Sequence, residues 1–502
     1  LIAVTAKLRA RSRDRLFLTL TISISLALLL CGTLTSDNLH GYDIHEEFRI
    51  FLQVSRTGYW DVEASHPYNS ALSISILPSI LASVSRLEGI RVFMLIFPLI
   101  FSMVPPVLYR ICRGLLTPEG AFLSAFLFMS YPTFYHEMIQ LGRQEVAGLL
   151  IVLLILMIVY PGRAQERRGG IIILLLTVGV VLGHYSLAYI YLFLLAFSLG
   201  LSHLPQGTVR LVTLGMLLLS TVIAVSWYLV AASGAAFTSL VGFLSFVGRG
   251  LLEDFFNPAS RPPVFLQAVG AAYVTPGLLH DVNRVTQYLV LFSLMLGFIV
   301  LVRKREKNTA ERRMLPLMAG GLFLLGCGVI LPFFAGGLNL SRVYHVALLF
   351  LSPCFVYGAD RLEWGLRRGL LLLHCHATSV HLAPGKRFVL ASTLLLSYFL
   401  FTSGWVWAVN MEVPTSPILD RERMLTYPEV YYTDFTVLQD IAGARWLRSY
   451  LVAGSSVCAD YLSSQHVLDS YGEFPRGTTA DVFKCNFAKS YVYLGRLNTL
   501  YG

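Results

Sequence analysis

The stretch LFLTLTISISLALLLCGTLTSDNLHGYDIHEEF, from Leu16 to Phe48, decides the fold because a membrane-length apolar run meets a cluster of charge in it. No charged residue occurs between Leu16 and Leu34, and about 20 apolar residues are enough for one helical crossing of a bilayer. Directly behind this run, four titratable side chains lie close together: Asp43, His45, Glu46 and Glu47. Such a cluster can gather a metal ion, a phosphate-bound sugar or a proton-transfer pair at the membrane surface. The alternative is a solvated acidic loop that caps a helix.

The composition places the whole chain among polytopic membrane proteins. Of its 502 residues, 55% are hydrophobic and only 14% are charged, and the mean hydropathy is +0.65. A chain this apolar has to be covered by lipid. We expect an all-α protein with about eleven transmembrane helices of roughly 20 residues each. They are predicted near 16–35, 90–110, 119–136, 145–161, 170–184, 186–203, 211–232, 285–302, 314–334, 344–360 and 388–409.

The distribution of basic residues sets the expected orientation. With a cytoplasmic N-terminus, more than half of the 39 Lys and Arg residues fall on predicted cytoplasmic segments, as the positive-inside rule requires. An odd number of spans then leaves the C-terminus outside. We therefore expect a multi-pass protein of the plasma membrane with GYDIHEEF on its external face. The net charge of +10 is explained by this rule, so nucleic acid is not an expected partner.

Two domains are expected. Residues 1–410 are expected to form a transmembrane module with external loops at 36–89 and 233–283, and Ala71 to Ser85 is predicted as a short helix that lies at the outer surface or dips into it. Residues 411–502 contain more Asp, Tyr and Ser, and they predict a small external α/β domain. Cys458 and Cys485 both lie in this domain, where an oxidising compartment would permit a disulfide. The sequence leaves open whether they pair.

A second external cluster, HEMIQLGRQE from His136 to Glu145, precedes a span. Arg143 and Glu145 are only two residues apart, so a helix cannot place both on one face, and one of them should point into a cavity. The alternative is that Glu145 caps the helix that follows. Glu137 lies in the same segment.

Two further motifs are predicted to reach the same external face. GHYS places His184 and Tyr185 at the end of a helical hairpin, where an imidazole usually faces protein rather than lipid. NLSR places Arg342 just ahead of a span, where a guanidinium group can reach a phosphate. A structural histidine and an interfacial anchor are the alternatives.

Carboxylates, a histidine and arginines that converge on one membrane face suit transfer from a lipid-linked phosphate. Cationic side chains hold the phosphate leaving group, while a carboxylate acts as general base on an acceptor hydroxyl. A divalent metal ion could help to neutralise the phosphate, with Asp43, His45 and Glu145 as its candidate ligands. The candidate catalytic residues are Asp43, which we expect to be the base, its closest competitor Glu46, and Glu145. The candidate substrate-binding residues are His45, Glu137, Arg143, His184, Tyr185 and Arg342.

The order of these motifs resembles the GT-C superfamily of integral membrane glycosyltransferases. GYDIHEEF matches the acidic motif of the first external loop, with Asp43 in the matching position, and HEMIQLGRQE matches the second acidic position, with Glu137 or Glu145. A poorly characterised archaeal and bacterial GT-C-like family is similar along almost the whole chain. It shares GYDIHEEF, TGYWD (57–61), LGRQE (141–145), GHYSLAYIY (183–191) and YGEF…SYVYLGRLN (471–498). The resemblance implies a polyprenyl-phosphate sugar as donor, and a glycan, lipid or protein as acceptor.

Two other functions compete with the glycosyltransferase hypothesis. A transporter or flippase of lipid-linked glycans would carry charges at mid-span and an internal repeat. The sequence has neither, because its charges fall near the predicted helix ends and its halves do not resemble each other. A non-catalytic assembly subunit is favoured if the acidic clusters are only paired surface charges.

Overall fold

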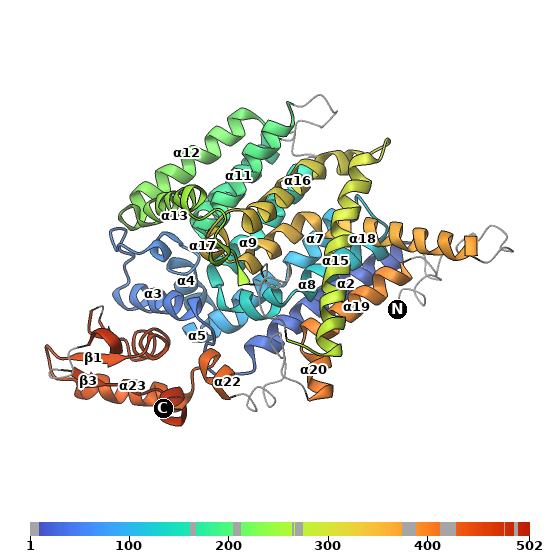
Figure 1. Ribbon diagram of the computed structural model, residues 1–502. Coiled ribbons are helices and arrows are strands. Elements are labelled where there is room, and N and C mark those ends of the chain that lie inside the picture. The colour runs from blue at the N-terminus through green and yellow to red at the C-terminus, as the bar shows by residue number, and fades with distance from the viewer. Residues whose placement is uncertain are drawn as a thin grey trace.

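Every apolar run that the sequence predicts to cross a membrane coincides with a helix in the computed structural model. The structure describes residues 10–160, 167–203, 212–263, 266, 275–373, 388–411, 428–475, 477–485 and 490–501. The helices form one large bundle (Figure 1). Those that match predicted spans are α2 (Ala10–Thr33), the series α5 (Gly89–Arg91), η2 (Val92–Ile96), α6 (Phe97–Phe101) and α7 (Val104–Cys112), then α8 (Pro118–Ser130), α9 (Gly142–Val159), α10 (Arg167–Gly183), α11 (Tyr185–Leu201), α12 (Leu214–Val230), α15 (Leu278–Arg303), α16 (Thr309–Ile330), α18 (Leu340–Leu373) and α19 (Val389–Thr402).

The chain is a multi-pass membrane protein. Within the described ranges, 7 helices are long and apolar enough to cross a bilayer, and four apolar helices are shorter. The shorter ones are Ile76–Ser85, Gly169–Gly183, Tyr185–Leu201 and Val389–Thr402. The total of about eleven crossings stays a prediction, since it depends on these short helices.

Both predicted external loops contain helices. The segment 36–89 holds α3 (Asp43–Thr57), η1 (Pro67–Ser70) and α4 (Ile76–Ser85), so GYDIHEEF is the start of a helix rather than a loop. The segment 233–283 contains α13 (Ala235–Glu253), which follows α12 after the turn η6 (Ala231–Gly234). Several glycines and serines interrupt the apolar pattern of α13, and they hid an amphipathic helix from a count of apolar residues.

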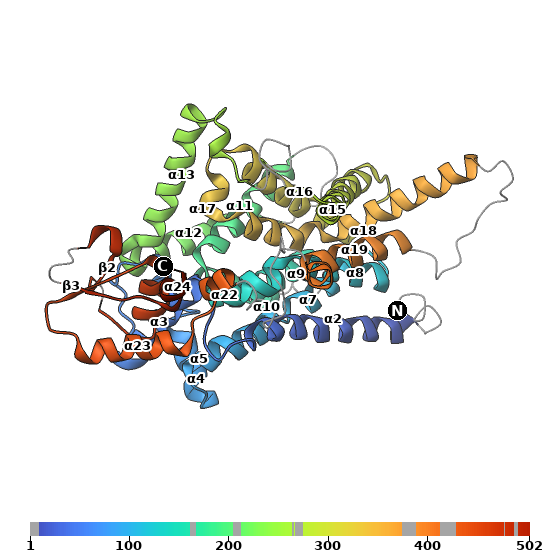
Figure 2. The ribbon, with the colours of Figure 1, turned by 60° about the horizontal axis from the view of Figure 1, so that its bottom comes forward.

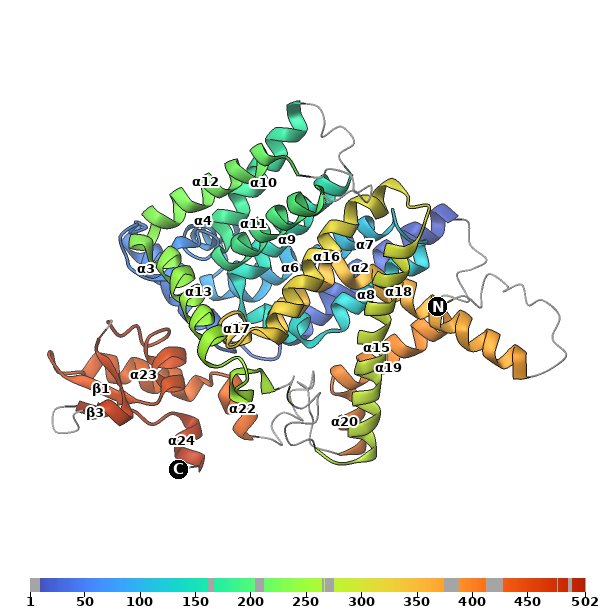
Figure 3. The ribbon, with the colours of Figure 1, turned by 45° about the horizontal axis from the view of Figure 1, so that its top comes forward.

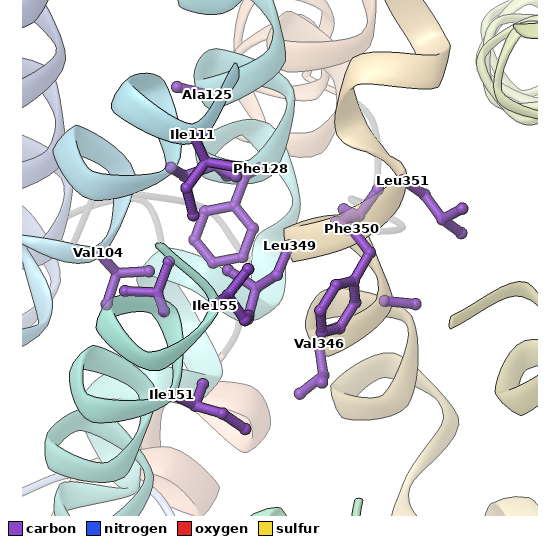
Figure 4. Packing of buried hydrophobic residues seen from close by; sticks show 14 of the residues in the cluster. Val104, Ile111, Ala125, Phe128, Ile151, Ile155, Val346, Leu349, Phe350 and Leu351 are labelled. Atoms are coloured by element: carbon purple, nitrogen blue, oxygen red, sulfur yellow. The ribbon is translucent and has the colours of Figure 1, made fainter. Parts of the chain in front are cut away.

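Close contact between α15 and α18 depends on two glycines. A Cβ atom on Gly297 would lie 1.7 Å from the carbonyl oxygen of Cys354, and one on Gly358 would lie 1.9 Å from that of Ser293. Small residues let membrane helices approach until their backbones touch. Elsewhere the bundle is filled by large apolar side chains, and Figure 4 shows part of this core, built from α7, α8, α9 and α18.

A small sheet follows the helical bundle in sequence and lies at one end of it. The C-terminal elements are α22 (Pro428–Asp434), α23 (Leu438–Tyr450), β1 (Ser456–Ala459), η9 (Ser463–Leu468), β2 (Thr479–Asp481), η10 (Val482–Lys484), β3 (Ser490–Val492) and α24 (Arg496–Tyr501). Strand β1 lies between β2 and β3 and is parallel to both. A disulfide joins Cys458 of β1 to Cys485. Figures 1 to 3 place these elements beside α3, away from the N-terminus, while the far end of α18 projects on the opposite side (Figure 2, Figure 3).

Candidate active site

The turn before α3 fixes where its charged side chains point. Gly41 has a φ of +96°, which favours glycine, and a Cβ atom there would lie 2.1 Å from Oε1 of Gln140. The N–H of Gly41 donates to the carbonyl oxygen of Asp434 at 2.7 Å. The helix that starts at Asp43 then repeats every 3.6 residues, so Asp43 and Glu47 share one face while His45 points the opposite way.

A cavity of about 270 Å³ opens beside this face of α3. It brings together five of the predicted site residues from four separate parts of the chain: Asp43, Arg143, His184, Tyr185 and Arg342. Its other lining residues are Tyr68, Gln144, Ser186, Leu187, Ile190, Gly336, Gly337, Leu338, Asn339, Val343 and Val346. Arginines and a carboxylate therefore lie in the same cavity as apolar side chains.

Two arginines hold the carboxylate of Asp43. Nη2 of Arg143 donates to its Oδ2 at 3.0 Å, and Nη1 of Arg342 donates to the same oxygen at 3.1 Å. Burial opposes ionisation of Asp43, but the two guanidinium groups outweigh it and hold its pKa below the usual range. Asp43 is therefore ionised at neutral pH.

Arg143 is fixed more firmly than Arg342. Its side chain is 4% exposed and also pairs with Glu47 through Nη1. Its guanidinium group stacks 3.7 Å above the centre of the Tyr68 ring. The side chain of Arg342, by contrast, is 27% exposed, so it has more freedom to move.

Glu137 lies beyond Arg342 rather than in the cavity lining. Its Oε2 is 3.5 Å from Nε of Arg342, and the hydroxyl of Thr133 donates to its Oε1 at 2.9 Å. Together with the contacts of Asp43, this pair extends one continuous row of alternating charge. The row runs in the order Glu137, Arg342, Asp43, Arg143 and Glu47.

His184 is a neutral side chain in the cavity wall. Its Nδ1 accepts hydrogen bonds from the backbone N–H groups of Ser186 at 3.1 Å and Leu187 at 3.3 Å, which caps the start of α11. Burial first, and then the charges of Arg143 and Arg342, lower the pKa of His184 well below its ordinary value. A neutral imidazole that accepts at Nδ1 carries its proton on Nε2, so it can donate from that atom.

Four predicted site residues are not in the cavity lining: Glu137, Glu46, His45 and Glu145. Glu46 pairs with Arg49 at 2.6 Å and lies 3.7 Å from His66. His45 points toward the C-terminal elements, where its ring stacks on His466 at 4.5 Å. The two residues follow the helical rotation of α3, which turns His45 away from Asp43.

The expectation that Asp43, Glu145 and His184 line one cavity is wrong for Glu145. Glu145 is fully buried in α9, and neither of its carboxylate oxygens has a hydrogen-bond partner among the residues that the structure describes. It lies two positions after Arg143, so the helix turns it about 200° away. Of this pair, it is Arg143 that faces the cavity.

The residues do not fit the predicted metal site. Asp43 faces the cavity, whereas His45 and Glu145 point in other directions. Within the described part of the chain, no group of three or more His, Cys, Asp or Glu side chains could hold a metal ion. Asp43 also lies between two guanidinium groups, whose positive charge opposes a cation beside it.

Sequence reasoning missed two residues that complete the cluster. Glu47 belongs to GYDIHEEF, and its position four residues after Asp43 would have placed it on the same face of a helix. A prediction that this motif is helical would therefore have identified Glu47 as a site residue. Tyr68 lies in a short 3₁₀ helix, and its neighbours in the sequence give no comparable signal.

Comparisons with known proteins agree with the helical architecture. A family model described as "Predicted membrane protein (DUF2206)" matches residues 169–502. No curated protein matches the chain in sequence. The structure of ArnT from Cupriavidus metallidurans bound to undecaprenyl phosphate is similar with a TM-score of 0.50 and 13% identity, covering 93% of this chain and 86% of that chain. The chain therefore has a fold similar to that of ArnT, which confirms the GT-C-like fold that the resemblance in sequence implied.

A second solved structure is the Archaeoglobus fulgidus oligosaccharyltransferase in complex with Zn and sulfate. It gives a TM-score of 0.47 and 14% identity, covering 93% of this chain and 62% of that chain.

Proposed function

The chain belongs to the DUF2206 family of predicted membrane proteins, and we propose that it is a membrane glycosyltransferase. It takes a sugar from a polyprenyl-phosphate donor and passes it to a hydroxyl group of a glycan, lipid or protein acceptor. The observation that carries this proposal is the carboxylate of Asp43 between two arginines in one cavity. The GT-C fold supports it, and so does the undecaprenyl phosphate bound to the structurally similar ArnT.

The two arginines suit a phosphate leaving group. Guanidinium groups stay charged and bind phosphate oxygens as a fork. Arg342 is the more exposed of the two, so it would meet the donor phosphate first, and Arg143 would complete the site. Tyr185 and the Nε2–H group of His184 lie in the same cavity wall, where they would contact the donor.

In the proposed reaction, Asp43 takes the proton from the acceptor hydroxyl. The acceptor oxygen then bonds to the sugar carbon that carries the phosphate. The bond from this carbon to the phosphate oxygen breaks, and its electron pair leaves with the polyprenyl phosphate. Both arginines stabilise this charge as it develops. When they turn toward the phosphate, Asp43 loses the positive charges that lower its pKa, and it becomes a stronger base.

The proposed location is the external face of the plasma membrane, with the N-terminus in the cytoplasm. The disulfide between Cys458 and Cys485 supports an external C-terminal domain, because disulfides persist in oxidising compartments. Membrane lipids then surround the bundle, and the lipid-linked donor reaches the cavity from the bilayer.

The test measures sugar transfer by the purified protein in vesicles that contain undecaprenyl-phosphate sugars. The release of undecaprenyl phosphate is the measured signal. Asp43→Asn keeps the shape of the side chain, and loss of a general base should lower the rate by about 10²–10⁴-fold. Glu119→Gln is the matched control, since Glu119 also pairs with an arginine, Arg13, at 2.7 Å. Its rate should equal that of the wild type, and thermal melting checks that each variant is folded.

Other outcomes would change the assignment. If Asp43→Asn keeps normal turnover and Glu46→Gln abolishes it, the base is Glu46. If the wild-type protein moves a lipid-linked glycan across the vesicle without releasing undecaprenyl phosphate, the protein is a flippase. If neither process occurs, a non-catalytic assembly subunit is the better interpretation.

A further inference from the structure

Glu47 lies beneath the cavity at the point where α3 meets α9. Its side chain is 0% exposed. Its Oε1 accepts a hydrogen bond from Nη1 of Arg143, and its Oε2 accepts one from the backbone N–H of the same residue at 3.3 Å. This N–H belongs to the first turn of α9, where the helix dipole favours a negative charge. Glu47 therefore fixes both the backbone and the guanidinium group of Arg143.

The surroundings of Glu47 leave this carboxylate little room to move. A Cβ atom on Gly142 would lie 3.0 Å from Oε2 of Glu47 and 2.6 Å from Cδ2 of Phe97. A larger residue at position 142 would therefore press against the carboxylate of Glu47 and the Phe97 ring of α6. The contact between Glu47 and Arg143 is thus part of the way the two helices pack.

The charges around Arg143 give this contact a consequence for the proposed reaction. Arg143 pairs with Asp43 on the cavity side and with Glu47 on the buried side. To bind a donor phosphate, its guanidinium group has to exchange Asp43 for the phosphate. Without a second counter-charge, a buried guanidinium group would stay with Asp43, because an unpaired buried charge is costly.

We propose that Glu47 is a positioning residue, which holds Arg143 in the cavity while the guanidinium group exchanges Asp43 for the donor phosphate. The proposal rests on the glycosyltransferase function, and it assigns Glu47 a role through Arg143 alone. Glu145 differs, since it is equally buried on α9 but forms no hydrogen bond with an arginine among the residues that the structure describes.

The pKa of Glu47 agrees with this arrangement. Burial raises it, Arg143 lowers it and Asp43 raises it, and the result is a pKa of about 7. The titratable groups that face Glu47 are Asp43 from its own helix, Arg143 and Glu145 from α9, Tyr68 from η1 and Tyr185 from α11. Glu47 therefore gains its full charge, and holds Arg143 most firmly, above neutral pH.

A double-mutant cycle tests whether Glu47 acts through Arg143. The variants are Glu47→Gln, Arg143→Ala and the double variant, and the measured quantities are kcat/KM for the donor and the Kd for undecaprenyl phosphate. Glu47→Gln should lower kcat/KM by about 10–100-fold, because a misplacement of about 1 Å at a site can cost about 10²-fold. In the Arg143→Ala background the same change should have almost no further effect.

Additive effects of the two changes would overturn the proposal, since a merely structural role of Glu47 would persist without Arg143. If thermal melting shows that Arg143→Ala is unfolded, Arg143→Lys takes its place in the cycle. The effect of Glu47→Gln should then be smaller in the lysine background, because an ammonium group lacks the fork that bridges two partners. An equal effect in both backgrounds would contradict the proposal.

The two readouts separate this inference from the proposed function. A wild-type protein that binds undecaprenyl phosphate but transfers no sugar contradicts the function, while the cycle in Kd still decides the role of Glu47. If the wild-type protein transfers sugar normally and Glu47→Gln has the same kcat/KM and Kd as the wild type, only the role of Glu47 is contradicted. A wild-type protein that neither binds nor transfers overturns both.

Discussion

One carboxylate oxygen of Asp43 receives hydrogen bonds from two arginines that differ in mobility. Arg143 is enclosed by Glu47 and Tyr68, whereas within the described part of the chain Arg342 is held by Asp43 and by Glu137 at 3.5 Å. The site therefore has a fixed cationic wall and a more exposed cationic side chain opposite it. This difference predicts different effects for changes at the two arginines.

Arg342→Ala should raise the KM for a polyprenyl-phosphate donor by about 10-fold or more, since a hydrogen bond to a charged group contributes roughly 1.5–3 kcal/mol. Arg342→Lys should give an intermediate KM, because lysine keeps the charge but binds phosphate at a single point. Donor titrations in the vesicle assay measure both values. An unchanged donor KM in Arg342→Ala would remove Arg342 from the site.

Residue identity was more predictable than side-chain direction. Asp43, Arg143, His184, Tyr185 and Arg342 could be found because polar groups at the ends of membrane helices usually face protein. Their partners could not be found, because the direction of a side chain depends on where its helix begins. Once α3 begins at Asp43, the rotation of the helix sends His45 away from the cavity and brings Glu47 beneath it.

At the scale of single elements, α15 and α18 meet through glycines that no larger residue can replace. Gly297→Ala or Gly358→Ala would press a methyl group against a backbone carbonyl of the partner helix. We expect each variant to lose about 1–3 kcal/mol of stability, the usual cost of overpacking, and to melt at a lower temperature in detergent. Gly326→Ala is the control, because a Cβ atom there meets nothing within 4 Å. A control that melts as early as the other two would refute this explanation.

The second face of α3 is a histidine-rich interface with the C-terminal elements. His45 stacks on His466, and His40 stacks on Phe435 at 4.8 Å. Burial lowers the pKa of His40 to about 3 and that of His466 to about 4, and the pKa of His45 falls well below its ordinary value for the same reason. Nearby histidines lower the values of His40 and His45 further. All three are neutral in the folded protein at pH 7.

This interface should weaken in acid. These histidines bind protons more readily when the protein is unfolded, at a pKa of about 6.5, so their contribution to stability is complete above that pH. It is lost as the pH falls from about 6.5 toward about 4. The melting temperature should therefore drop over this range, and His466→Phe should reduce the drop. The same pH dependence in wild type and His466→Phe would contradict this account.

Hydropathy predicted the long membrane helices well, but it did not predict α13. Long apolar runs such as α15 and α16 were clear, since their composition alone requires lipid. Helix α13 was not, because glycines and serines interrupt its apolar residues. The turn that separates it from α12, with positive φ at Ala232 and Ser233, leaves no clear mark in the sequence.

At the scale of the whole molecule, the bundle and the small sheet are parts of one site-bearing structure. The helical core positions Arg143 and Arg342 on α9 and α18, while the sheet and its neighbouring helices pack against α3 (Figure 1). The proposed orientation places the cavity and the sheet on the same side of the membrane. This arrangement leads to a test that needs no substrate.

Cys458 and Cys485 should resist alkylation until the protein is reduced, because they are paired. After mild reduction of intact cells, a membrane-impermeant maleimide should label Cys485, the partly exposed partner of the pair, if the C-terminal domain is external. The double variant Cys458→Ser with Cys485→Ser is the control for labelling elsewhere in the chain. Labelling that appears only after the cells are permeabilised would place this domain in the cytoplasm.

The contacts that hold the start of α3 join two segments far apart in the chain. The N–H of Leu39 donates to the hydroxyl of Tyr471 at 2.9 Å, and the side-chain amide of Asn38 donates to the carbonyl oxygen of Thr436 at 3.2 Å. The hydroxyl of Ser470 donates to the carbonyl oxygen of His45 at 2.9 Å. The two residues of the first of these contacts are 432 positions apart, so a ribosome makes Tyr471 long after Leu39. The proposed catalytic carboxylate of Asp43 can therefore reach its final place only after the segment around Tyr471 has been synthesised and, in the proposed orientation, carried across the membrane. Biogenesis itself would keep the nascent protein inactive until this segment has arrived.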